Sequence, residues 1–318
     1  MRLALKILAA AILTVLTYIA IGGVMVATAG ALPMRGEMVD IGGGRRMHII
    51  CEGPRTAAPT ILFEAGAFGF SADWGALQPK VVAQGLHACA YDRAGLGLSD
   101  PGPEPRDANA VVGDLEKLLK AAHEDGPFIL VGHSMAGLYL PLFAARNPDK
   151  IAGLVFVDAA TPDMSETPSG RQFAEAFRKA SRLAAFGARL GLFTPLKGTW
   201  LGDKYGLPPV ASDEKRRAFA SPDHNRWASA EVDQWMASAA EARAAGPLNP
   251  AWPVAVITAG AHRADLSGLT YAPARASHAG YSENVPRATH QTLVGLAHSD
   301  AVLRGIDHVR DAGAKSAP

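Results

Sequence analysis

The 318-residue sequence has little charge and few cysteines. Charged residues make up 19% of the chain, the formal net charge is +1, and no long basic run occurs. A sequence without a basic tract is not typical of nucleic-acid binding, so we expect no nucleic-acid partner. It also lacks a clustered metal-ligand motif, a haem motif and a nucleotide-binding fingerprint, so we expect no metal and no cofactor. What remains is a chain that is 48% hydrophobic, as in globular proteins.

The N-terminus carries one long apolar segment. Arg2 and Lys6 precede an apolar run from Ile7 to Val26, which is long enough to span a bilayer. Positive charge before the run predicts that the N-terminus stays in the cytoplasm and that the rest is exported. We favour a retained anchor over residues 1–30, because of the length. A cleaved signal peptide is the alternative, with Ala27-Thr28-Ala29 as a small-residue cleavage site. With a retained anchor, the body is held at the inner membrane and faces the periplasm. With a cleaved signal peptide, it is periplasmic or secreted.

A serine between small residues lies near the middle of the chain. Four apolar residues, Phe128 to Val131, run into Gly132-His133-Ser134-Met135-Ala136, and a helix-like stretch follows. This is the strand–serine–helix pattern of the nucleophile elbow, in which a strained turn tolerates only small neighbours two places before and after the serine. The usual pattern ends in glycine, whereas here Ala136 takes that place and Gly137 comes one residue late. We interpret Ser134 as a nucleophile.

A glycine-rich loop follows an earlier buried strand. Thr60–Glu64 is predicted to be that strand, and Ala65-Gly66-Ala67-Phe68-Gly69 comes next. An acyl-transfer serine needs backbone N–H groups directed at the developing oxyanion, and a glycine-rich turn can bring the backbone that close. The candidate donors are the amides of Ala67 and Met135. An ordinary strand-to-helix turn is the alternative.

A third motif identifies a family resemblance. The predicted strand Leu86–Tyr91 leads into Asp92-Arg93-Ala94-Gly95-Leu96-Gly97-Leu98-Ser99, and a helix and the serine elbow follow. In this order the motifs resemble the α/β-hydrolase superfamily, and within it the AB-hydrolase-1, peptidase-S33-like serine hydrolases, over roughly residues 37–309. We interpret Asp92 and Arg93 as structural residues.

The resemblance implies an α/β fold with a mostly parallel eight-stranded sheet flanked by helices. Residues 36–160 and 250–318 would form the core, and residues 161–249 a helical cap. Helices are expected in the cap at Arg171–Arg189, Ser212–Ala220 and His224–Ala245, and the last strand of the core at Thr289–Val294. The strands that carry Cys51 and Cys89 would be neighbours, so we expect a disulfide in an exported chain. Two free buried cysteines are the alternative.

The superfamily's triad appears in the order serine, acid, histidine, with the histidine after the last strand. His298 follows the predicted strand Thr289–Val294 and is our candidate base, whereas His278, His290 and His308 fit that place less well. Asp158, after the strand Ile151–Val157, is the favoured acid, and Asp265 is the alternative.

We therefore expect a serine hydrolase that cleaves an ester, because a serine in place of an aspartate disfavours the dehalogenase and epoxide-hydrolase reactions of the superfamily. An amide- or peptide-cleaving aminopeptidase of the S33 type is an alternative. A non-catalytic binding protein with the same fold is an alternative of another class. The expected partners are a small-molecule ester or acyl substrate and, through the N-terminal segment, a membrane.

Overall fold

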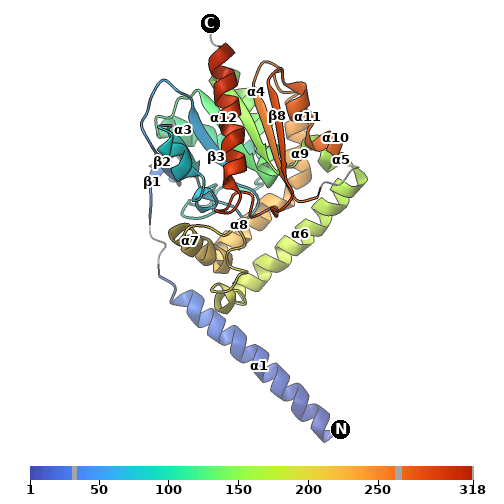
Figure 1. Ribbon diagram of the computed structural model, residues 1–318. Helices are drawn as coiled ribbons and strands as arrows, with labels where there is room; N and C mark the ends of the chain where they lie inside the picture. The colour runs from blue at the N-terminus through green and yellow to red at the C-terminus, as the bar shows by residue number, and fades with distance from the viewer. Residues whose placement is uncertain (31–33, 262–266, 317–318) are drawn as a thin grey trace.

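The computed structural model describes residues 1–30, 34–261 and 267–316, and it contains one eight-stranded sheet flanked by helices (Figure 1). The strand order is β1-β2-β4-β3-β5-β6-β7-β8, which is the predicted α/β architecture. β1 and β2 pair antiparallel, as do β2 and β4, and all later pairs are parallel. The strands are β1 Glu37–Asp40, β2 Arg46–Glu52, β3 Thr60–Glu64, β4 Ala88–Tyr91, β5 Phe128–His133, β6 Ile151–Val157, β7 Val254–Ala259 and β8 Gly280–Val285.

Helices cover both faces of the sheet because its central strands are apolar on both sides. Leu62 and Leu130 point to one face, where α3 and α4 pack, and Ile61 and Ile129 point to the other, where α2 and α12 pack. The helices of the core are α2 Gln78–Ala83, α3 Ala108–Ala121, α4 Leu140–Arg146, α10 Ser267–Thr270, α11 Ala272–Ala276 and α12 Ser299–Ser316.

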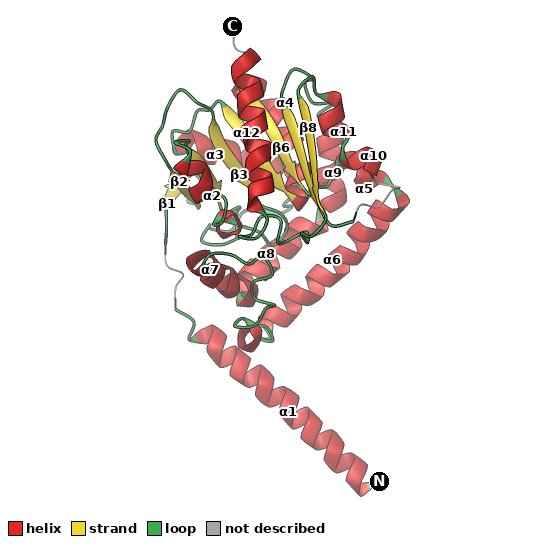
Figure 2. Ribbon diagram, viewed as in Figure 1, coloured by secondary structure: helices red, strands yellow, loops and turns green. Residues whose placement is uncertain are grey.

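Five helices lie between β6 and β7 in the chain, and we call them the cap helices. They cover the edge of the sheet at which the parallel strands end (Figure 2). The predicted segment His224–Ala245 is two helices, α8 and α9, separated at Gln234. The cap helices are α5 Pro162–Glu166, α6 Pro168–Arg189, α7 Pro209–Ala220, α8 Pro222–Asp233 and α9 Trp235–Ala244.

The last strand differs from the prediction. Residues 289–294 form turns, and the last strand is β8, Gly280–Val285, at the edge of the sheet. Its residues alternate between exposed and half-buried, so it lacks the continuous apolar run that marks a buried strand. Leu293 and Val294 are apolar because they are fully buried against the core, not because they form a strand.

The helix after the elbow is also shorter than expected. Ser134–Leu138 forms a 3₁₀ turn, and α4 begins only at Leu140. Pro141 therefore lies in the first turn of α4, where no intrahelical N–H donor is required, and it does not kink a longer helix.

The two cysteines form the predicted disulfide. Cys51 on β2 and Cys89 on β4 are directly opposite each other in an antiparallel pair, with their Cα atoms 4.1 Å apart. The bridge joins segments 38 residues apart.

The N-terminal segment is one long helix, α1 Arg2–Ala27. It is long and apolar enough to cross a membrane, and nearly all of it is exposed. At 1.5 Å per residue its 26 residues extend roughly 39 Å, against roughly 30 Å for the hydrocarbon core of a bilayer. It is consistent with membrane association.

Candidate active site

Ser134 occupies a sharp turn at the carboxyl end of β5. Its φ is +57°, in the left-handed region that non-glycine residues seldom adopt, and its carbonyl oxygen accepts a hydrogen bond from the amide of Ala160 at 2.9 Å. A Cβ atom on Gly132 would lie 2.6 Å from Leu140 and 3.0 Å from the Cβ of Ala136. The small residues of the motif therefore allow the strand and the following helix to approach closely.

Gly137 has its own packing role. A Cβ atom at this position would lie 2.0 Å from the carbonyl oxygen of Ala160, so the elbow can touch the loop after β6 only with glycine here. Ala136, which stands where the motif usually has glycine, is fully buried, and the close packing of the elbow accommodates its methyl group. Gly137, the glycine one place late in the motif, is thus required because the loop that carries Ser134 touches the loop that carries Asp158 at this position.

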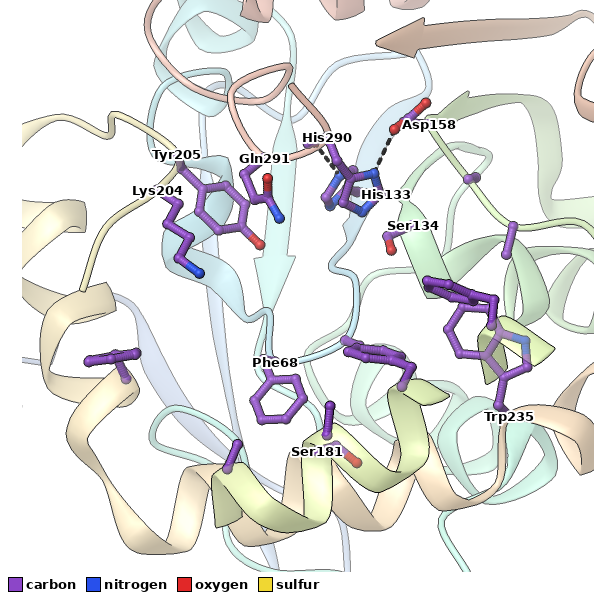
Figure 3. A pocket seen from close by; sticks show the side chains of 18 of the residues that line it. Phe68, His133, Ser134, Asp158, Ser181, Lys204, Tyr205, Trp235, His290 and Gln291 are labelled. Carbon is purple, nitrogen blue, oxygen red and sulfur yellow. Dashed lines mark hydrogen bonds and ion pairs between the residues drawn. The ribbon is translucent and has the colours of Figure 1, made fainter. Parts of the chain in front are cut away.

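Asp158 follows β6 and is bound to His290. Asp158 Oδ2 lies 2.6 Å from His290 Nδ1, and Oδ1 accepts a hydrogen bond from the amide of Ala259 at 3.2 Å (Figure 3). Burial raises the pKa of Asp158, but the hydrogen bond and charge of His290 outweigh burial and hold the pKa below its usual value of 3.8. Among the described residues, Nε2 of His290 has no hydrogen-bond partner. Ser134, Asp158 and His290 all line the same pocket.

His298, the expected base, lies outside the lining of the pocket. His298 is in the turn that leads into α12 and does not belong to the residues that line the pocket, whereas His290 does. The rule that the histidine follows the last strand indicates His290 once β8 is taken as that strand. A last strand at residues 289–294 would make His298, eight residues after His290, the histidine that follows it. The alternative acid, Asp265, lies outside the described residues.

His133, inside the elbow motif, was not singled out by the sequence patterns. Its Nε2–H donates to the carbonyl oxygen of His290 at 2.9 Å, and the two rings lie 4.5 Å apart between centroids. Burial, followed by the charge of His290, lowers the pKa of His133 from 6.5 to about 3. His133 is therefore a neutral donor that holds the backbone of His290.

The glycine-rich loop after β3 lies against the elbow. A Cβ atom on Gly66 would lie 2.8 Å from the Cβ of Ser134, so only glycine allows this contact. The next residue, Ala67, lines the pocket. Met135 lies in the first turn of the 3₁₀ helix after Ser134, where backbone N–H groups have no intrahelical acceptor. Ala67 therefore shares the pocket with Ser134, and Met135 follows Ser134 directly in the chain.

A buried ionic network supports that loop. Arg93 donates to Glu64 and to Glu231 on α8, at 2.6 and 2.8 Å, and also to the carbonyl oxygens of Ala65 and Gly66. Arg93 and both carboxylates are almost fully buried. Burial raises the pKa of Glu64 despite the charge of Arg93. Arg93 therefore fixes the backbone before Ala67 and ties a cap helix to the core.

Asp92 has a comparable structural role in the neighbouring loop. Its carboxylate accepts hydrogen bonds from the amides of Ser71 and Leu98, each at 2.9 Å, and lies 2.9 Å from Nδ1 of His48. Neither Asp92 nor Arg93 lines the pocket, and both bind backbone groups of loops around it.

The pocket lies between the sheet and the cap helices and has a volume of about 870 Å³. Its wall toward the cap is largely apolar, with Phe173, Phe177, Phe193, Phe219 and Trp235. Among the described residues that line it, Asp158 is the only carboxylate, and Lys204 and Lys215 are the charged cap residues. Lys215 is paired with Asp73 at 2.7 Å. The pocket thus fits an apolar, uncharged group better than a cation.

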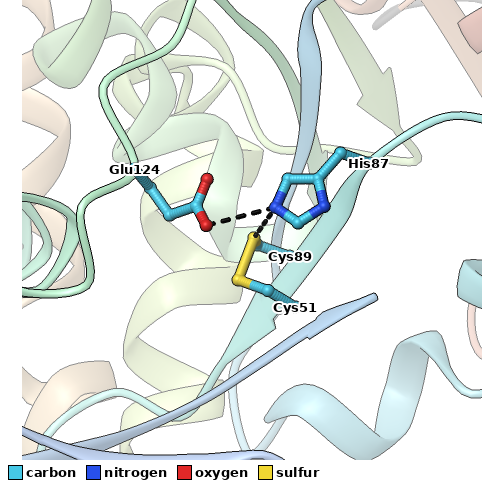
Figure 4. Close-up of side chains that lie close together, drawn as sticks. All are labelled: Cys51, His87, Cys89 and Glu124. Carbon is cyan, nitrogen blue, oxygen red and sulfur yellow. Dashed lines mark hydrogen bonds and ion pairs between the residues drawn. A yellow bond between two sulfur atoms is a disulfide. The ribbon is translucent and has the colours of Figure 1, made fainter. Parts of the chain in front are cut away.

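A second cluster of ligand-type side chains lies around the disulfide. Cys51, His87, Cys89 and Glu124 place their ligand atoms within 4.8 Å of one another (Figure 4). The sulfur atoms are bonded to each other, so neither is a free thiolate, which is the form that binds metals. His87 Nε2 lies 3.1 Å from Glu124 and Nδ1 lies 3.0 Å from the carbonyl oxygen of Gly53. In this state the cluster is a disulfide beside the hydrogen bond between His87 and Glu124.

Comparison with known proteins supports the fold. The family model described as "alpha/beta hydrolase fold" matches residues 59–255, more than half of the chain. The Bacillus subtilis "Uncharacterized protein YqjL" is 38% identical over 104 residues, which are 33% of this chain and 41% of that protein. The chain therefore spans less than half of this relative.

Two solved structures are similar over most of the chain. Cfl2 from Burkholderia cenocepacia gives a TM-score of 0.69 at 19% identity, covering 88% of this chain and all of that one. The enol-lactonase from Burkholderia xenovorans LB400 gives a TM-score of 0.59 at 19% identity, covering 85% of this chain and 98% of that one. At these identities the likeness concerns the fold alone.

Proposed function

Since the chain belongs to the alpha/beta hydrolase fold family, we propose that it is a serine hydrolase that cleaves carboxylic esters with Ser134, His290 and Asp158. The observation that carries the proposal is the 2.6 Å contact between Asp158 and His290 in the pocket that also contains Ser134. A serine hydroxyl is a weak nucleophile without an adjacent base, and an imidazole held by a carboxylate is the usual activating arrangement.

The reaction proceeds through an acyl-enzyme. Ser134 Oγ attacks the ester carbonyl carbon while its proton passes to His290 Nε2, and Asp158 stabilises the resulting imidazolium. The amides of Ala67 and Met135 donate hydrogen bonds to the oxyanion. Collapse of the intermediate breaks the bond to the alcohol, which leaves with the proton from His290. Water, deprotonated by His290, then attacks the acyl-enzyme and releases the acid and Ser134.

The lining of the pocket favours an ester over the N-terminus of a peptide. An aminopeptidase must bind a free ammonium group, and the one carboxylate among the described lining residues, Asp158, is already bound to His290. The other charged groups there are lysines. An uncharged acyl ester needs no such partner.

The N-terminal helix and the disulfide support an exported location. We interpret α1 as a retained anchor, with the body on the periplasmic side of the inner membrane, since Arg2 and Lys6 precede the apolar run. A disulfide persists in oxidising compartments, and the periplasm is one of them.

The test is hydrolysis of p-nitrophenyl esters of increasing acyl length by the full chain in detergent, with Ser134→Ala as the matched control. We expect turnover in the wild type and a loss on the order of 10³-fold or more in the variant. A fluorophosphonate probe, which reacts only with an activated serine, should label the wild type alone. Absence of both turnover and labelling would support the non-catalytic binding protein instead.

A further inference from the structure

The anchor helix α1 is docked on the cap. The hydroxyl group of Tyr18 donates to the carbonyl oxygen of Leu192 at 2.8 Å. Gly22 and Gly191 touch through their backbones, and a Cβ atom on Gly22 would lie 2.2 Å from the carbonyl oxygen of Gly191. Figure 1 shows α1 leaving the molecule on the cap side, away from the end that carries the C-terminus. A segment suited to a membrane is therefore held directly against the turn after α6.

This contact determines how far the cap lies from a bilayer that α1 spans. A membrane span needs about 20 apolar residues, and the run from Ile7 to Val26 supplies them. Tyr18 and Gly22 lie in the second half of that run, so the turn they contact must lie at the membrane surface or below it. The turn is itself apolar, with Leu190, Leu192 and Phe193. The cap cannot stand clear of a membrane that α1 spans.

The cap helix that ends at this turn, α6, has an exposed apolar stripe. Phe173, Ala176, Ala180, Leu183 and Phe186 recur every three or four residues along α6, and all five are exposed. The large side chains Phe173, Leu183 and Phe186 are 55%, 71% and 62% exposed. α6 runs crosswise to α1 rather than along it (Figure 1). A helix that lies in the plane of a membrane surface has this arrangement.

Two further features fit a lipid surface. Trp200, shortly after the segment that contacts α1, is 71% exposed, and tryptophan is enriched at membrane interfaces. Of the exposed basic residues on α6, Arg171, Lys179 and Arg182 are ion-paired with carboxylates of the chain, and Arg189, at the end of the helix, is in no ion pair among the described residues. A basic side chain beside an apolar helix face complements the anionic lipids of a membrane surface. We call the five stripe residues and Trp200 the apolar cap face.

The apolar cap face adjoins the active-site pocket. Phe173 and Ala180 are exposed members of the stripe and also line the pocket. Phe193 in the turn after α6 lines the same pocket, as do Leu201 and Gly202 in the segment that follows. The pocket thus reaches the surface where α6 is apolar, and an acyl chain could pass from lipid to Ser134 without crossing bulk water.

We propose that the apolar cap face rests on the bilayer spanned by α1, and that the substrate is a long-chain acyl ester dissolved in that bilayer. The substrate enters the pocket past α6. The identity of the substrate rests on the serine-hydrolase function proposed above, whereas the contact between cap and bilayer does not.

Membrane contact is tested by fluorescence quenching on the full chain in nanodiscs of phosphatidylcholine and phosphatidylglycerol with brominated acyl chains. α1 contains no tryptophan, and Trp74, Trp227 and Trp235 are at most 7% exposed. The fifth tryptophan, Trp252, is half-buried just before β7, at the end of the sheet opposite the cap helices, so contact between the cap and lipid would be reported mainly by Trp200. We expect brominated lipid to quench the emission of the wild type and to quench Trp200→Phe far less. Equal emission in brominated and unbrominated nanodiscs would overturn the proposal.

Substrate entry is tested with two esters in the same nanodiscs, water-soluble p-nitrophenyl butyrate and bilayer-dissolved p-nitrophenyl palmitate. We expect Leu183→Glu/Phe186→Glu to reduce palmitate hydrolysis roughly tenfold or more, because charge is costly at membrane depth, and to leave butyrate hydrolysis unchanged. Leu296→Glu, the same change at an exposed leucine outside the face, should leave both unchanged. Equal palmitate rates in the wild type and the double variant would contradict the proposed entry route. If the wild type neither hydrolyses butyrate nor is labelled by the fluorophosphonate probe, the serine-hydrolase function is refuted, and the proposed substrate with it. The quenching experiment still tests membrane contact in that case.

Discussion

Backbone strain is concentrated at the pocket. Among the described residues, four other than glycine have a positive φ, and three of them, Phe68, Ser134 and Asp158, line the pocket. Such conformations cost about 1–3 kcal/mol each and persist only where the surrounding structure enforces them. Two of these residues stand at the ends of the neighbouring strands β5 and β6. The strain therefore coincides with the side chains to which we assign nucleophile and acid.

Asp158→Asn tests the acid. An amide cannot stabilise the imidazolium of His290 and can favour the wrong tautomer, so we expect kcat to fall by about 10³–10⁴-fold with a small change in KM. The readout is p-nitrophenyl ester hydrolysis in detergent. Asp265→Asn is the matched control, because it removes the other carboxylate that the sequence suggests, and it should retain activity. Comparable rates for Asp158→Asn and the wild type would exclude Asp158.

The buried pair His48 and Asp92 predicts a pH dependence of stability. Burial lowers the pKa of His48, but Asp92 outweighs it and raises that pKa above 6.5. Burial raises the pKa of Asp92, but the hydrogen bond and charge of His48, with other hydrogen bonds, hold it below 3.8. The contribution of His48 is fully present below pH 6.5 and is lost as the pH rises through its folded pKa. The contribution of Asp92 is present above pH 3.8 and is lost as the pH falls through its folded pKa.

We therefore expect the Tm of the full chain in detergent to decline as the pH rises above 6.5. In His48→Gln, which has no titrating imidazole, this decline should be smaller. The measurement is a series of thermal melts across the range, and parallel curves for both proteins would show that His48 does not contribute.

At the level of elements, the strongly apolar strands could be predicted and the polar edge strand could not. β5 and β6 are buried on both faces, so Ser134 and Asp158 at their ends could be located from the sequence. β8 pairs on one side only and alternates in exposure, so its sequence does not mark it as a strand, and the pattern indicates His298 rather than His290 as the histidine after the last strand. The pairing of His290 with Asp158 depends on chain segments 132 residues apart, which no local pattern contains.

Glu231 on α8 links the cap to the core through Arg93. Glu231→Gln would leave a fully buried guanidinium with one carboxylate instead of two, so we expect a loss of roughly 3 kcal/mol in the free energy of unfolding. Activity should fall as well, since Arg93 holds the backbone before Ala67. Glu175→Gln, at an exposed ion pair on α6, is the control and should leave the unfolding transition unchanged. An unchanged transition in Glu231→Gln would mean that Glu64 alone satisfies Arg93.

At the level of the whole molecule, composition and motif order sufficed to predict an α/β-hydrolase fold preceded by an apolar N-terminal helix. They did not predict that α1 packs on the cap, because Gly22 and Gly191 carry no signal beyond being small. The disulfide could be predicted from the sequence, since both cysteines lie on strands that are neighbours in this fold.

The disulfide should contribute appreciably to stability. It closes a loop of 38 residues, for which the chain-entropy model gives about 4 kcal/mol. We expect Cys51→Ser/Cys89→Ser to lose a large part of this in urea unfolding of the full chain in detergent. Ester hydrolysis under native conditions should persist, because neither cysteine lines the pocket. A double variant as stable as the wild type would show that the bridge adds nothing to folding.

The most direct test of the account compares His290→Ala with His298→Ala. Both variants remove one imidazole, from residues only eight positions apart, but His290 alone contacts Asp158 and lines the pocket. The measurement is ester hydrolysis together with fluorophosphonate labelling of Ser134, under identical conditions. We predict that His290→Ala loses both activities by about 10³-fold or more and that His298→Ala keeps both. Loss in His298→Ala with activity retained in His290→Ala would contradict the proposed site.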